Sequence, residues 1–151
     1  MKSIGTEFSR STGCDAALND YGIPSLLEIL KGVKPGENTF DGRGSTAPDS
    51  KYGTVGKMFE NPNNTAGAAV HMYVGYPQLN KMFLGPAYFD PGSFGVTGFY
   101  SAAQAFIIIH ESVHLIGNKY DHDFGGSKNL TRLLVNNCYP ALRGKLGGLY
   151  N

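Results

Sequence analysis

The longest periodic pattern of apolar residues in the chain lies between Ser101 and Ile116. Apolar side chains recur there at helical spacing, at Ala102, Phe106, Ile109, Val113 and Ile116. Because residues three or four positions apart share one face of an α-helix, this stripe predicts a helix with one side in the core. Gly117 follows directly and is expected to end the helix through its freedom at positive φ.

Weaker patterns predict a small number of further elements. Two more helices are expected, over residues 22–32 and 127–142. Partial alternation of β-branched and aromatic side chains predicts short strands, over residues 53–59, 68–75 and 81–85. Residues 1–18 are polar and rich in Gly, Ser and Thr, so they are expected to be irregular. The predicted fold class is α+β, with a small sheet packed beside the 101–116 helix and a C-terminal helix.

Composition adds bounds on size and partners. The chain has 151 residues, of which 41% are hydrophobic and 17% charged, as in globular proteins that bury their own core. Residues 1–151 are therefore expected to form one domain, complete in itself or part of a longer secreted protein. The formal net charge is +1, and Lys and Arg are scattered singly. This charge pattern gives no reason to expect nucleic acid or a membrane as partner.

Two further observations concern the environment of the protein. No apolar run is long enough to cross a bilayer, and the first residues are too polar for the apolar core of a signal peptide. The two cysteines, Cys14 and Cys138, can form one disulfide that closes a long loop, or they can be two buried thiols. The disulfide is favoured, because the polar segment around Cys14 otherwise lacks an anchor.

The predicted 101–116 helix carries the sequence His-Glu-x-x-His, formed by His110, Glu111 and His114. Positions i and i+4 lie above one another on a helix, so both imidazoles can reach one metal ion. Glu111 lies one position round the helix, where it can reach a water molecule on that ion. This is the zinc-binding pattern of metallopeptidases. The sequence therefore predicts His110 and His114 as ligands of Zn²⁺ and Glu111 as the catalytic base.

One ligand is missing from the helix, because catalytic zinc has three protein ligands and one open position. The later glutamate of thermolysin-like enzymes has no counterpart, since no Glu follows Glu111. The third histidine of metzincins is replaced by Tyr120, and no methionine is available downstream for their methionine turn. The remaining candidates lie in one turn, at Asp121, His122 and Asp123. His122 is favoured as the third ligand, with either aspartate as the alternative.

Three segments carry a resemblance to known proteins: Phe83–Phe89, His110–Gly117 and Asn136–Cys138. They resemble a group of little-characterised bacterial His-Glu-x-x-His proteins, many of them exported, with a similar Leu-Gly-Pro segment before the zinc helix and a late Asn-Cys. The resemblance covers about the second half of the chain. It implies a zincin-like metallopeptidase that acts on a peptide or protein substrate, and a location outside the cell or in the cell envelope.

In this interpretation Glu111 activates a zinc-bound water that hydrolyses the peptide bond. Tyr120 or Tyr139 is a candidate donor to the oxyanion, and an extended substrate is expected to pair with the edge of one predicted strand. The alternative hypothesis is a non-catalytic metal-binding or interaction module that retains the helix motif, with the metal structural or absent.

Overall fold

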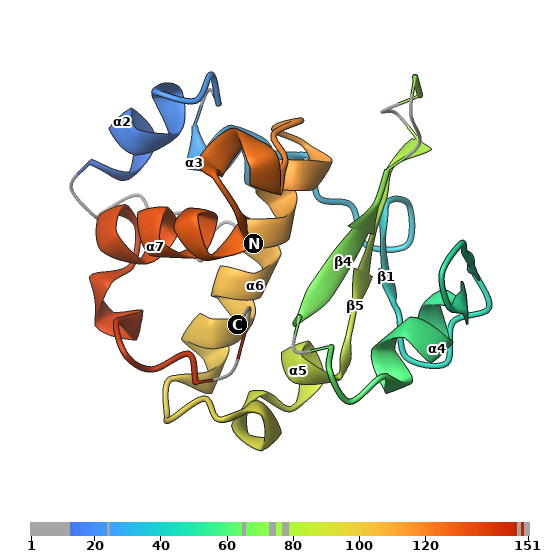
Figure 1. Ribbon diagram of the computed structural model, residues 1–151. Helices are drawn as coiled ribbons and strands as arrows, with labels where there is room; N and C mark the ends of the chain where they lie inside the picture. Colours follow the sequence, from blue (N-terminus) through green and yellow to red (C-terminus); the bar gives the residue numbers. More distant parts are fainter. Residues whose placement is uncertain are drawn as a thin grey trace.

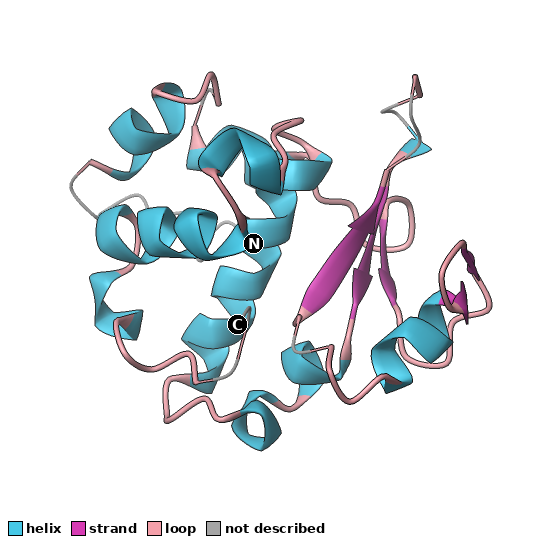
Figure 2. Ribbon diagram, in the orientation of Figure 1, coloured by secondary structure: helices cyan, strands magenta, loops and turns pink. Residues whose placement is uncertain are grey.

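The structure is a computed structural model that describes residues 13–147 and 149, apart from residues 24, 65, 73, 74, 77 and 78. It confirms the α+β class, with several helices beside a small sheet (Figure 2). The α-helices are α2 (Cys14–Asn19), α3 (Leu26–Lys31), α4 (Val55–Glu60), α5 (Pro86–Phe89), α6 (Tyr100–Leu115) and α7 (Ser127–Asn137). Short 3₁₀ turns are η2 (Pro91–Phe94), η3 (Asp121–Phe124) and η4 (Pro140–Leu142). The strands are β1 (Thr39–Asp41), β2 (Pro48–Asp49), β3 (Gly53–Thr54), β4 (Ala68–His71) and β5 (Lys81–Leu84).

The main sheet has three strands in the order β1-β5-β4. Strand β1 runs parallel to β5, whereas β4 is antiparallel to β5, with Ala68 opposite Leu84 and His71 opposite Lys81. Helices α2, α3, α6 and α7 gather on one side of this sheet, and α4 lies on the other (Figure 1). Because β4 comes last in the strand order, it is an outer strand of the sheet, and it packs beside α6.

Helix α6 runs through the centre of the helical layer and is buried on nearly every side. Every residue from Ala105 to Leu115 is buried, including the polar ones. The run Ala105–Ile109 explains this, because a helix that is apolar all round can be covered on all sides. The predicted helix is confirmed, but the single apolar stripe was too narrow a description. The motif residues lie on a helix enclosed by the core.

Gly67 sets how closely the strand β4 approaches α6. A Cβ atom built on Gly67 would overlap the side chain of Ile107, so no larger residue fits there without displacing this buried side chain. The neighbouring residues Ala66, Ala68 and Ala69 are also small. The start of β4 consequently forms a close wall beside the motif helix.

A disulfide between Cys14 and Cys138 joins α2 to the residue that follows α7, which confirms the favoured pairing. Both cysteines are buried, and their Cα atoms are 4.5 Å apart. The bridge closes a loop with a sequence separation of 124 residues. It fastens the end of α7 to the helical layer.

Some local predictions were wrong. The strand expected at residues 53–59 is the two-residue β3 followed by helix α4, because the Thr54 hydroxyl accepts the Lys57 N–H and caps a helix there. Part of the segment expected to be irregular is helix α2, while residues 1–12 lie outside the described part. Strand β1 was not predicted. The last helix ends at Asn137, and Pro140 begins a separate turn, since proline cannot continue the hydrogen-bonding pattern.

The end of α6 also differs from its prediction. The residue at positive φ is Asn118, with φ 52°, and Gly117 is not among the residues at positive φ. A Cβ atom on Gly117 would lie 2.7 Å from the carbonyl oxygen of Val113, so a close backbone approach explains this glycine. No helix in the described ranges is long and apolar enough to cross a membrane.

Candidate metal centre

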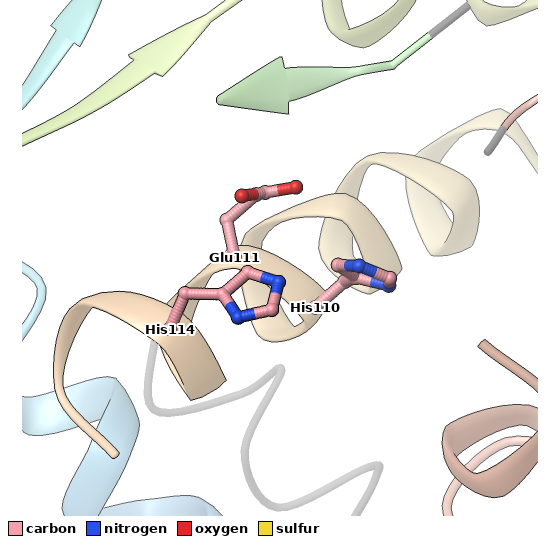
Figure 3. A group of neighbouring side chains, drawn as sticks. All are labelled: His110, Glu111 and His114. Carbon is pink, nitrogen blue, oxygen red and sulfur yellow. The ribbon is translucent and has the colours of Figure 1, made fainter. Parts of the chain in front are cut away.

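Helix α6 brings His110, Glu111 and His114 together as a possible metal site. One ligand atom from each lies within 4.8 Å of the other two, and the three residues are 1%, 5% and 8% exposed. Figure 3 shows the two imidazoles on one side of the helix and the Glu111 carboxylate turned toward the sheet. The helical spacing thus produces the arrangement that the motif predicts.

The orientation of His114 is set by the turn that follows α6. Its Nδ1 lies 2.7 Å from the carbonyl oxygen of Lys119. A carbonyl can only accept, so Nδ1 is the donor of this hydrogen bond, and Nε2 is the nitrogen on the other side of the ring. The positive φ of Asn118 bends the chain back so that this carbonyl reaches the ring. A histidine that binds a metal through one nitrogen commonly donates from the other to a backbone carbonyl.

His110 is held in a similar way by α7. Its Nδ1 is 3.3 Å from the Thr131 hydroxyl oxygen, so a contact from α7 fixes this edge of the ring. Burial, with a further contribution from the neighbouring His114, holds the pKa of His110 well below its usual range. The ring is therefore neutral near pH 7, which is the state that a metal ligand requires.

Among the three candidates in the turn, Asp121 contacts His114 and lines the same cavity, although its carboxylate is not one of the three groups that converge within 4.8 Å. Its Oδ1 is 3.3 Å from the Nε2 of His114. Two ligand atoms that each lie about 2.0–2.2 Å from a tetrahedral zinc ion are separated by about 3.3–3.6 Å, so this distance fits two ligands of one ion. Two imidazole nitrogens and a carboxylate oxygen are also a ligand set that suits zinc.

The other two residues of the turn are engaged differently. The side chain of His122 is 79% exposed, and its Nε2 lies 3.6 Å from the Asp123 carboxylate. The other oxygen of Asp123 accepts the backbone N–H of Tyr120 at 2.7 Å, so this carboxylate closes the turn η3. The structure therefore brings Asp121 to His114 and leaves His122 facing solvent; the role of His122 as third ligand stays a prediction.

The three motif residues line a cavity of about 240 Å³ between α6 and strand β4. The β4 side of the cavity is formed by small and apolar residues, Ala66, Ala68, Ala69, Val70 and Met72. Tyr120, Asp121 and Ser127 complete the lining. An outer strand, a carboxylate and two imidazoles thus share one cleft of a size that holds part of a peptide.

Two contacts at the centre were not anticipated from the sequence. The contact with the Lys119 carbonyl cannot be predicted from the type of residue, because any residue at that position supplies the same backbone oxygen. Thr131 lies on the predicted last helix, next to its apolar face, and only the packing of α7 on α6 shows that it reaches His110.

Comparison of the chain with protein-family models, with curated proteins and with solved structures finds no match. The function must therefore be argued from the chemistry of the cleft itself.

Proposed function

We propose that the chain is a zincin-like, zinc-dependent metallopeptidase that hydrolyses peptide bonds in the cleft between α6 and β4. The observation that carries the proposal is the convergence of His110, Glu111 and His114 in a cleft bordered by an outer strand. The buried, neutral state of His110 and the fixed ring of His114 add support, because a metal binds a neutral imidazole that is held in one orientation.

Asp121 is the third ligand in this proposal, in preference to His122. The support is its 3.3 Å separation from His114 Nε2 and its place in the cavity lining, to which His122 does not belong. Three protein ligands leave one position open for water, as in other catalytic zinc sites. When bound, zinc supplies a Lewis acid that lowers the pKa of water and polarises a carbonyl group.

The residues of the chain account for the remaining requirements of the reaction. Glu111 takes a proton from the attacking water and later gives it to the leaving amine, so it serves first as base and then as acid. The outer edge of β4 pairs with the extended substrate through backbone hydrogen bonds. Tyr120 lines the same cavity and is the better placed of the two tyrosines considered as donors to the developing oxyanion.

The decisive experiment combines metal analysis with a Glu111→Gln variant. We expect about one zinc per chain in both proteins, and a loss of peptidase turnover of about 10²–10⁴-fold in the variant, the range for removal of a general base. Glu28→Gln provides a matched control, because Glu28 is an exposed glutamate on α3. Turnover should be unchanged in that protein.

The other outcomes are equally informative. Full turnover in Glu111→Gln would remove Glu111 from its assigned role. Protein that binds zinc but cleaves no peptide in a diverse peptide mixture would support the alternative, a non-catalytic metal-binding module. Failure of the native chain to bind zinc would overturn the proposal as a whole.

A further inference from the structure

A second cavity, of about 440 Å³, lies between α7 and the C-terminal residues. Three basic side chains line it, Lys128, Arg132 and Arg143. Lys128 and Arg132 are four residues apart on α7 and so share one face of the helix. The lining between them includes the buried apolar residues Val135, Leu142 and Leu149. The cavity thus combines an apolar floor with a positively charged rim.

The charge of this rim is not neutralised within the described part of the chain. No ion pair joins Lys128, Arg132 or Arg143 to an acidic side chain there, and the lining of the cavity contains no Asp or Glu. Arg143 donates to the side-chain oxygen of Asn136, a neutral partner. The whole chain has 13 basic and 12 acidic residues, so this local excess is not a reflection of overall composition.

The cavity adjoins the candidate metal centre through α7. Thr131 lines the cavity and is also the residue whose hydroxyl contacts His110. One position before Lys128, Ser127 lines the cleft between α6 and β4. The first two turns of α7 therefore have the cleft and the basic cavity as neighbours.

We propose that this cavity binds the side chain of an aspartate or glutamate in the substrate, close to the bond that is cleaved. Guanidinium groups hold carboxylates through paired hydrogen bonds, and the apolar floor accommodates the methylene groups of the acidic side chain. This inference rests on the proposed function, because the acidic peptide is a substrate only if the protein is a peptidase. It adds a substrate class, peptides with an acidic residue near the scissile bond.

The test is a binding measurement that does not depend on turnover. Fluorescent peptides that differ only in the position of a single Glu are compared with peptides that carry Gln at the same place. Their affinities for the zinc-treated Glu111→Gln protein are measured by fluorescence anisotropy at low and moderate salt. We expect at least one position at which Glu binds about fivefold more tightly than Gln, a modest factor because the rim is partly exposed to solvent. This preference should weaken as salt is added.

Variants with reversed charge identify the cavity as the source of the preference. In Lys128→Glu/Arg132→Glu the preference for Glu should vanish or invert, whereas Lys57→Glu, on the distant α4, should retain it. The variant Lys128→Gln/Arg132→Gln removes both charges without adding new ones, and it replaces the charge-reversed variant if that protein does not fold. The inference is overturned if no position favours Glu, if salt has no effect, or if the preference survives in the double variants.

This experiment separates the two proposals. If the native protein cleaves peptides but Glu is nowhere preferred, the peptidase stands and the acidic subsite fails. If Glu is preferred but neither zinc binding nor cleavage is found, the cavity is an acidic-peptide site and the proposed function fails.

Discussion

The two halves of the candidate metal centre are held in place by different physical means. The α6 half, His110 and His114, is almost completely buried, and core packing on several sides fixes the helix. The turn half, Asp121, lies on a four-residue 3₁₀ turn with its side chain 55% exposed. Local hydrogen bonds, such as that from Tyr120 N to Asp123, hold the turn. Substitutions in the core around α6 should therefore affect stability, while those in the turn should affect metal binding alone.

Loss of the disulfide is the largest expected perturbation of this arrangement. In Cys14→Ala/Cys138→Ala the free energy of unfolding should fall by about 5 kcal/mol, because the bridge closes a loop of more than a hundred residues and restricts the unfolded chain. Chemical denaturation under non-reducing conditions measures this loss. The metal affinity of the folded variant should change little, since Cys138 follows the last residue of α7, about two helical turns beyond Thr131.

Treatment with a reducing agent serves as the control. It should lower the stability of the native protein to that of the double variant, and it should leave the stability of the double variant unchanged. A large drop in zinc affinity in folded protein would contradict the comparison, because the turn half would then depend on an anchor at the far end of α7.

Substitutions within the turn give the next largest effect and decide between the two candidate ligands. Asp121→Ala should weaken zinc binding by about a hundredfold or more, since loss of a direct ligand exceeds the typical 10–100-fold effect of a supporting residue. Equilibrium competition with a chelating dye measures the affinity. His122→Ala is the matched variant, and it should bind zinc as the native protein does because its side chain is exposed.

The metal-free stability of both proteins should remain close to native, since surface substitutions usually change it by less than about 0.5 kcal/mol. If His122→Ala loses the metal and Asp121→Ala does not, the assignment is reversed and the interpretation from sequence was right.

The same contrast explains which features could be predicted from the sequence. The apolar period of residues 101–116 predicts α6 almost to its ends, and the motif spacing places His110 and His114 on one side, because both signals are local and periodic. The turn has no period. Whether Asp121, His122 or Asp123 faces the cleft depends on hydrogen bonds within η3 and on the bend at Asn118. Strand β1 was missed for a related reason, since three residues paired with a distant strand leave little pattern.

Thr131 links the helix half of the centre to α7, and its substitution should give the smallest effect. In Thr131→Val the ring of His110 loses a hydrogen bond at Nδ1, which helps to fix this edge of the ring. Zinc affinity should fall by about tenfold, the lower end for a group that supports a metal ligand. Thr131→Ser keeps the hydroxyl and should restore most of the affinity.

Nitrogen NMR shifts of His110 report the tautomer and would separate loss of orientation from a general loss of packing. If Thr131→Val binds zinc as tightly as the native protein, then burial within α6 and the core is enough to orient His110 without the hydrogen bond from α7.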